Sequence, residues 1–211
     1  MGQIKIGRLV MGSAVTNCYF LYREGEKEVI FFDPAAHGDV IFQKLQDAGF
    51  SVAAIFLTHG HFDHIYGLAA LEELSGAKSY AWEAEKELCE DVHMNVSDLF
   101  GRAVTAKVDE YLKDGAEFEF AGIKGRLIGT PGHTAGSCCY YFEEAGILIS
   151  GDTLFEESVG RTDFPTGSSS TLVRSIREKL FVLPDDTKVY PGHGEITTIE
   201  HEKKYNPFAG E

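Results

Sequence analysis

Apolar residues in this chain gather in short runs that are bounded by Gly, Pro, Asn and acidic residues. Such runs, rich in Val, Ile, Phe and Tyr, are typical of β-strands. The runs that predict strands are residues 4–10, 18–23, 28–34, 52–58, 117–120, 123–129, 137–142, 146–152 and 187–193. They arrive in two groups, over about residues 4–57 and 108–190, and this grouping indicates two sheets.

Stretches with helical spacing of apolar residues lie between the strands. Residues 39–48 have this spacing, with Asp39 as the expected N-cap and Gly49 as the expected C-cap. Helices are also predicted over residues 65–74, 81–92 and 169–183. Residues 93–107 have no clean period and are expected to form a loop over a site. No linker or low-complexity block divides the chain, so we expect one α/β domain over residues 1–211.

The composition excludes several classes of partner. The chain has 33 acidic and 19 basic residues and a net charge of -14. It has no run of Lys and Arg with interleaved aromatic residues, so nucleic acid is not expected as a partner. The N-terminal sequence lacks the pattern of a signal peptide, and no membrane-spanning apolar stretch is present. The four cysteines have no C-x-x-C spacing and are typical of reduced thiols, so we expect a soluble cytoplasmic protein.

Three histidines and one aspartate fall within six consecutive positions, in the sequence HGHFDH, directly after a predicted strand. Two histidines separated by one residue at a strand end can converge on one cation, so His59 and His61 are candidate ligands of a first ion. Asp63 and His64 are neighbours and point apart, which suits a second ion. Imidazole and carboxylate ligands together favour zinc.

Three more candidate ligands lie at the ends of predicted strands. GTPGHTAG places His133 in a Gly-Pro-Gly turn, GILISGDTLF places Asp152 after an apolar run, and KVYPGHGE places His193 after another. Because these independent motifs share one context, they indicate a single site. The remaining histidines are expected to be surface or hydrogen-bonded residues, and they are His37, His93 and His201.

With HGHFDH and the GH, GD and GH contexts of His133, Asp152 and His193, the chain strongly resembles the metallo-β-lactamase-fold hydrolases. The resemblance implies a four-layer αββα sandwich with a binuclear site at one edge, between the sheets. The ligand sets that it implies are His59, His61 and His133 for one Zn²⁺ and Asp63, His64 and His193 for the other. Asp152 and a hydroxide would bridge the two ions, and Fe or Mn could occupy either position.

Two longer stretches carry a closer resemblance within this superfamily. Asp152 stands where the main secreted β-lactamases have Cys, and GDTLFEESVGRTDFPTG and VYPGHGEITTIEHEKKYNPF are similar to glyoxalase II-like hydroxyacylglutathione hydrolases. Since 18 residues follow His193 (211 − 193), we expect the C-terminal helical domain that binds glutathione in full-length members to be absent. The resemblance implies hydrolysis of an anionic thioester derived from glutathione, of the S-lactoylglutathione type.

Thioester hydrolysis also suits the chemistry of the predicted site. A hydroxide between two cations attacks the carbonyl carbon while one zinc stabilises the oxyanion. A thiolate leaves without a proton, because the pKa of a thiol is about 8.5. Asp63 is expected to hold the hydroxide in line and to accept its proton. Arg161, in VGRTDFP, matches a basic position of the family and is expected to bind the glutathione part, unless it pairs with Asp163, Glu156 or Glu157.

Other functions remain as alternatives. An iron-dependent persulfide dioxygenase of the same fold shares the GRTDF stretch and would use His59, His133 and Asp152 as its ligands. The complete second ligand set and the PGHGE sequence around His193 favour the hydrolase. A non-catalytic binding module would be expected to lack ligands, because buried polar groups without a cation are costly. The acidic composition disfavours a nuclease.

Overall fold

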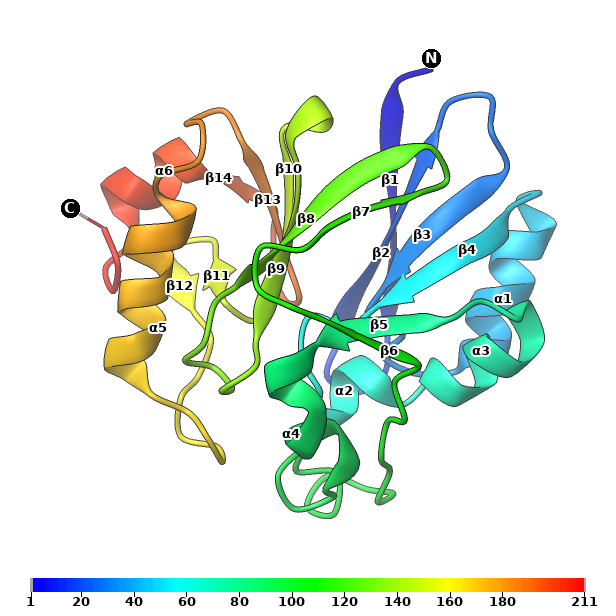
Figure 1. The fold of residues 1–211 in the computed structure, drawn as a ribbon. Coiled ribbons are helices and arrows are strands. Elements are labelled where there is room, and N and C mark those ends of the chain that lie inside the picture. Colours follow the sequence, from blue (N-terminus) through cyan, green and yellow to red (C-terminus); the bar gives the residue numbers. More distant parts are fainter. Residues whose placement is uncertain (1, 211) are drawn as a thin grey trace.

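Two six-stranded sheets face each other in the computed structural model, which describes residues 2–210 (Figure 1). The first sheet has the order β1 (Ile4–Met11), β2 (Thr16–Arg23), β3 (Glu28–Phe32), β4 (Ser51–Phe56), β5 (Ser79–Trp82), β6 (Glu110–Leu112). The second has the order β14 (Thr197–Thr198), β13 (Lys188–Pro191), β10 (Ile147–Gly151), β9 (Cys138–Phe142), β8 (Ile123–Gly129), β7 (Glu117–Phe120). A small ribbon pairs β11 (Leu154–Phe155) with β12 (Ser158–Val159).

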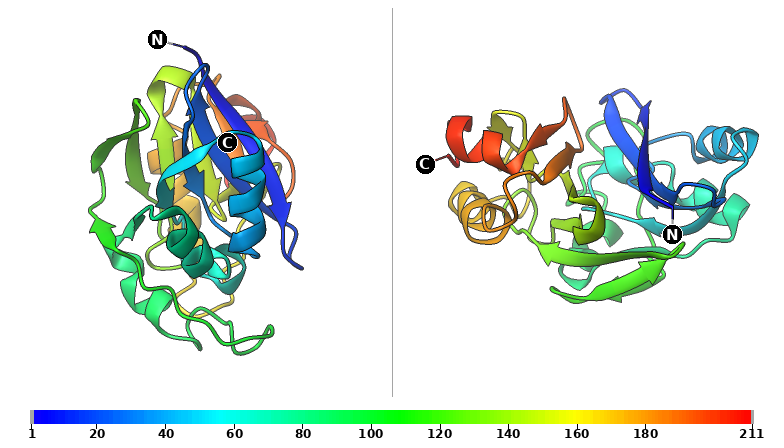
Figure 2. Two further views of the ribbon diagram at one scale, coloured as in Figure 1. Left: turned by 90° about the vertical axis from the view of Figure 1, so that its right-hand side faces the viewer. Right: turned by 90° about the horizontal axis from the view of Figure 1, so that it is seen from above.

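Helices cover the outer face of each sheet and complete four layers (Figures 1 and 2). The first sheet is covered by α1 (Gly38–Asp47) and α3 (Leu68–Ser75), and the second by α5 (Ser169–Ser175), its π-helical continuation η3 (Ile176–Leu180) and α6 (Ile199–Tyr205). The shorter helices are α2 (Phe62–Ile65), η1 (Glu83–Glu85), α4 (Lys86–Glu90) and η2 (Glu143–Ala145). The predicted αββα sandwich is therefore confirmed. No helix within residues 2–210 is long and apolar enough to cross a membrane.

Aromatic side chains fill the space between the two sheets. Phe32 and Phe56 of the first sheet contact Tyr140 of the second, with ring centroids 5.6 and 5.0 Å apart. The Tyr140 hydroxyl donates a hydrogen bond of 2.7 Å to the backbone carbonyl of Leu57. Because Leu57 directly follows β4, this bond fixes the point at which the chain enters the HGHFDH motif.

The grouping of strands and one predicted helix need correction. β6 belongs to the second predicted group but pairs with β5 in the first sheet. The helix predicted over residues 65–74 is present as α3, which begins three residues later than predicted, and Gly67 separates it from α2. A Cβ atom at Gly67 would lie 2.8 Å from the Pro34 carbonyl oxygen. This close approach to the loop after β3 separates the two helices, and apolar spacing cannot reveal it.

The caps of α1 also differ from the prediction. His37 is the N-cap residue, with a φ of 50°, so Asp39 lies in the first turn of the helix instead. Ala48 is the C-cap residue, and Gly49 follows it with a φ of +82°. Residues 93–107 contain no helix or strand, as predicted.

Candidate metal centre

All seven predicted ligands lie together at one end of the space between the sheets. They come from the loops that follow β4, β8, β10 and β13, with two of them on α2. They form three groups, and within each group one ligand atom of every residue lies within 4.8 Å of the others. The groups are His59, His61 and His133; Asp63, His64 and His193; and, between these two, His59, His64 and Asp152.

The first group consists of three buried imidazoles. His61 Nδ1 lies 2.8 Å from His133 Nε2, which lies 3.2 Å from His59 Nε2. Burial lowers the pKa of all three histidines, and it lowers the pKa of His61 to about 3. They are therefore neutral at pH 7, which is the form of imidazole that binds a metal ion.

Asp152 lies between the two predicted ion positions. Its Oδ2 atom lies 3.7 Å from His133 Nε2 and 3.5 Å from His193 Nε2. Burial by itself would raise the pKa of Asp152, but the neighbouring His64, His193 and His133 lower it well below the ordinary value. The carboxylate is thus ionised and within reach of both groups, as a bridging ligand requires.

Three carboxylates surround His64 in the second group. Asp33 Oδ2, Asp152 Oδ1 and Asp63 Oδ2 lie 3.0, 3.5 and 3.9 Å from the nearer imidazole nitrogen. Burial by itself would lower the pKa of His64, but these carboxylates raise it well above 6.5. Protonated His64 therefore offsets part of this buried negative charge, and a bound metal ion would offset it in place of that proton.

Buried atoms without partners test whether cations fit here. His64 Nε2 and Asp152 Oδ1 are both buried and make no hydrogen bond with the residues that the structure describes. Buried polar atoms are normally satisfied, so these two need another partner. Imidazole nitrogens and carboxylate oxygens are ligands of zinc, iron and manganese. The residues present therefore fit a pair of such cations.

Asp33 is a residue of the site that the sequence analysis did not select. It accepts hydrogen bonds from the backbone N–H and the hydroxyl of Thr58, at 2.7 and 2.8 Å, in addition to facing His64. It therefore links the end of β3 to the start of the ligand loop. Its position directly after an apolar run, the context that identified Asp152, was the available signal.

Asn17 is a second residue that the sequence analysis missed. Its side-chain amide donates to the carbonyls of Pro191 and Gly194, both at 3.0 Å. These two residues flank His193, so Asn17 holds the loop that carries this ligand. Nothing near Asn17 in the sequence indicates this role, because its partners are 174 and 177 positions away.

Arg161 lies beside the first group, through its backbone. Its carbonyl accepts a hydrogen bond of 2.7 Å from His133 Nδ1, and this bond leaves His133 Nε2 free to bind a cation. Its guanidinium makes two hydrogen bonds of 2.7 Å with Asp163 and lies 3.8 Å from the ring centroid of Phe164. The pairing with Asp163 that the sequence allowed is therefore present.

Three phenylalanines, Phe62, Phe100 and Phe164, form an aromatic wall beside the first group. The ring centroids of Phe62 and Phe100 are 5.0 Å apart, and Phe164 lies 6.0 Å from Phe100 and 5.6 Å from His61. Phe100 is 50% exposed and belongs to residues 93–107, the segment predicted to form a loop over the site. This segment thus contributes an apolar surface next to the ligands.

The histidines predicted to lie outside the site belong to none of the three groups, and they are His37, His93 and His201. His93 pairs with Asp98 and His201 pairs with Glu157, both near the protein surface.

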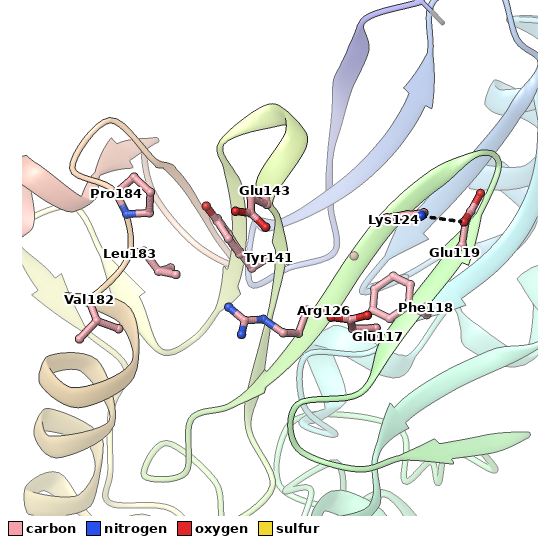
Figure 3. Close-up of a pocket in the computed structure, with 11 residues that line it drawn as sticks. Glu117, Phe118, Glu119, Lys124, Arg126, Tyr141, Glu143, Val182, Leu183 and Pro184 are labelled. Atoms are coloured by element: carbon pink, nitrogen blue, oxygen red, sulfur yellow. Dashed lines mark ion pairs between the residues drawn. The ribbon is translucent and has the colours of Figure 1, made fainter.

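A separate groove of about 730 Å³ lies between β7–β9 and the segment after η3, where Arg126, Tyr141 and Val182 are among the lining residues (Figure 3). None of its lining residues is a candidate ligand, so this groove is not the metal centre.

A cluster of histidines and aspartates that fits two cations, between two sheets with helices outside, is typical of a metal-dependent enzyme. Residues 12–193 match the family model described as the metallo-beta-lactamase superfamily, and the chain belongs to that superfamily.

Curated relatives and solved structures agree with this assignment. "Probable metallo-hydrolase YqgX" of Bacillus subtilis is 38% identical over 207 residues, which is 97% of each chain. "Hydroxyacylglutathione hydrolase GloC" of Haemophilus influenzae is 31% identical over 198 residues, 91% of this chain and 92% of the relative. The BLEG-1 B3 metallo-beta-lactamase structure has a TM-score of 0.92 and 36% identity, and covers 97% of this chain and 99% of its own. The structure of TTHA1623 in a di-iron-bound form has a TM-score of 0.83 and 31% identity. The match covers 96% of this chain and 99% of that one.

Proposed function

We propose that this protein hydrolyses thioesters with two Zn²⁺ ions per chain, and that its substrate is a hydroxyacylglutathione of the S-lactoylglutathione type. The observation that carries the proposal is the pair of ligand groups with Asp152 between them. The similarity to a hydroxyacylglutathione hydrolase supports the choice of substrate.

The chain's own residues have distinct tasks in this reaction. When bound, the two cations supply Lewis acidity and lower the pKa of water, so that a nucleophile is available at neutral pH. Asp63 orients this nucleophile and accepts its proton. The Thr16 hydroxyl donates to Asp63 Oδ2 at 3.2 Å, and His193 Nε2 lies 3.2 Å from the same oxygen, so the carboxylate is held in place. Although burial opposes it, His64 and His193 lower the pKa of Asp63 and keep it ionised.

A thioester is the ester class that this arrangement favours. A thiolate with a conjugate-acid pKa near 8.5 leaves without protonation, whereas an amine needs a proton donor. We therefore expect thioesters to be hydrolysed at least about 10³-fold faster than β-lactams or peptides.

Arg161 and the aromatic wall lie side by side, and we propose that they contact neighbouring parts of such a substrate. Arg161 is proposed to bind a carboxylate of the glutathione part, because a protein with a net charge of -14 repels an anion unless a local cation offsets the field. The aromatic wall, beside His61, is proposed to contact the apolar part of the acyl group.

Elemental analysis of protein purified without added metal, followed by assays with glutathione and coenzyme A thioesters, tests the proposal. We expect about two ions per chain, and we expect His61→Ala and Asp63→Ala to abolish hydrolysis. His201→Ala, at a position that belongs to none of the ligand groups, is the matched control and should retain activity. A single iron, with activity that survives the loss of Asp63, would instead favour the persulfide dioxygenase.

A further inference from the structure

One buried carboxylate beside the first group belongs to none of the ligand sets. Glu85, the last residue of η1, is 1% exposed. Its Oε1 atom accepts hydrogen bonds from the Gly60 N–H at 2.8 Å and from the Thr134 hydroxyl at 2.9 Å. Its Oε2 atom accepts from the Gly136 N–H and from the same hydroxyl, both at 2.9 Å. One side chain therefore connects two separate loops.

This arrangement is costly for the stability of the fold alone. Within residues 2–210, no Lys, Arg or His lies within ion-pair distance of the Glu85 carboxylate. Burial raises the pKa of Glu85 to about 7, although the three hydrogen-bond donors act in the opposite direction. A buried charge without an opposite charge destabilises a folded protein, so Glu85 calls for a reason other than packing.

The two loops that Glu85 connects carry all three ligands of the first group. Gly60 lies between His59 and His61 in the loop after β4, which belongs to the first sheet. Thr134 follows His133 in the loop after β8, which belongs to the second sheet. Glu85 therefore bridges the two sheets at the point where the three imidazoles meet.

Close packing makes this bridge specific. A Cβ atom at Gly60 would lie 2.7 Å from Cys89 Sγ, and a Cβ atom at Gly136 would lie 2.2 Å from the backbone nitrogen of Glu85. Both loops are thus pressed against η1 and α4 with no room for a side chain. The hydrogen-bonding atoms of Glu85 can reach both loops only because each has glycine at this position.

We propose that Glu85 is a positioning residue that sets the distance between the His59–His61 loop and His133, and thereby the affinity of the first cation. The inference rests on the proposed metal centre. Glu85 has no hydrogen bond to the residues of the second group, whose His193 loop is held by Asn17 instead. Its effect is therefore confined to one of the two cations.

Glu85→Gln is the variant that tests this role, because it keeps the shape of the side chain and replaces one acceptor oxygen with a donor. We expect the affinity for one Zn²⁺ to fall roughly 10–100-fold, as for other groups that orient metal ligands, with the second affinity unchanged. Competition between the protein and a chromophoric chelator for Zn²⁺ alone measures both affinities without substrate. In the thioester assay kcat should fall more than KM rises.

Glu202→Gln is the matched control. Glu202 is also fully buried and also accepts hydrogen bonds from neutral donors, which are the Thr197 hydroxyl, the Glu157 N–H and the Asn206 amide. These residues belong to none of the ligand groups. We expect this variant to lower the Tm and leave both Zn²⁺ affinities unchanged.

Thr134→Val and Thr134→Ser complete the test. Thr134→Val removes one hydrogen-bond donor to Glu85 and should reproduce the loss of Zn²⁺ affinity. Thr134→Ser retains the hydroxyl and should keep the wild-type Zn²⁺ affinity. If Glu85→Gln does not fold, the Zn²⁺ affinity of Thr134→Val tests the proposal by itself. Variants that lose Tm but bind both Zn²⁺ ions with wild-type affinity would overturn the role of Glu85. A wild-type protein that binds two Zn²⁺ ions and hydrolyses no thioester would instead contradict only the proposed function.

Discussion

Arg161 makes two interactions that its proposed role in substrate binding must accommodate. Its guanidinium forms an ion pair with Asp163 and lies over the ring of Phe164. Asp163 is exposed and Phe164 is half-buried. A substrate carboxylate would replace or join Asp163 as its partner. We expect Arg161→Ala to lower kcat/KM for anionic thioesters roughly 10–100-fold, as for the loss of one charge-assisted hydrogen bond, with much smaller losses for neutral thioesters.

Asp163→Asn is the control for this prediction, because it releases the guanidinium without removing it. Its kcat/KM for anionic thioesters should equal or exceed that of the wild type. Steady-state kinetics with a charged and a neutral thioester make the comparison. Equal losses for both substrates in Arg161→Ala, together with a lower Tm, would mean that Arg161 stabilises the loop rather than the substrate.

At the scale of single residues, the sequence indicated those residues whose neighbouring positions in the chain form a recognisable pattern. The motifs that contain the seven predicted ligands follow apolar runs, and the structure brings all seven residues together. Asn17 and Glu85 could not be predicted, because their role depends on partners that are distant in the sequence. The atoms that bind Glu85 come from Gly60 and from Thr134, 25 and 49 positions away.

The contact between α1 and the start of α3 fixes the position of α2, the short helix that contains the predicted ligands Asp63 and His64. A Cβ atom at Gly38, the first residue of α1, would lie 2.1 Å from the Gly67 carbonyl oxygen and 2.7 Å from the Leu71 nitrogen. Gly67 is three residues beyond His64 (67 − 64). Any displacement at this crossing is therefore transmitted to a ligand.

We expect Gly38→Ala to reduce the free energy of unfolding by about 1–3 kcal/mol, because backbone atoms on both sides cannot give way, and to weaken metal binding as well. Gly49→Ala is a suitable comparison. Its φ is +82° and a Cβ atom would meet nothing within 4 Å, so only backbone strain of about 1 kcal/mol is expected. Urea unfolding measures both variants. A Gly38→Ala protein as stable as wild type would show that the crossing can relax.

Long elements were predicted because burial gives them a regular pattern. β3 and β4 are apolar on both faces, since helices cover one face and the second sheet covers the other. β6 and β14 have three and two residues, too few to show a period, and α6 has apolar side chains only at Ile199 and Tyr205. β5 was also missed, and its last two residues lie in the stretch 81–92 that was predicted as a helix. The break at Gly67 depends on a tertiary contact, which no local pattern contains.

For the molecule as a whole, the metal-free protein should be sensitive to acid. Burial lowers the pKa of His61 to about 3, whereas in the unfolded chain it is near 6.5. The unfolded state therefore binds a proton that the folded state does not bind between these values. The resulting stability is fully present above about pH 6.5 and is lost as the pH falls toward 3.

Urea midpoints of chelator-treated protein at pH 7 and pH 5 measure this effect. We expect the wild-type midpoint to fall, and the fall to be smaller in His61→Gln, which has no group to protonate at this position. The comparison with a variant isolates His61, since the raised pKa of His64 contributes with the opposite sign. The same pH dependence in both proteins would contradict the prediction.

Because the predicted ligands come from both sheets, the two proposed ligand groups become complete at different times during synthesis. The first group is complete once His133 has been made, and the second only with His193, 60 residues later (193 − 133). At ribosomal rates of about 5–20 residues per second, this interval lasts roughly 3–12 s. A nascent chain released between these points would hold the ligands for one ion and lack those for its neighbour.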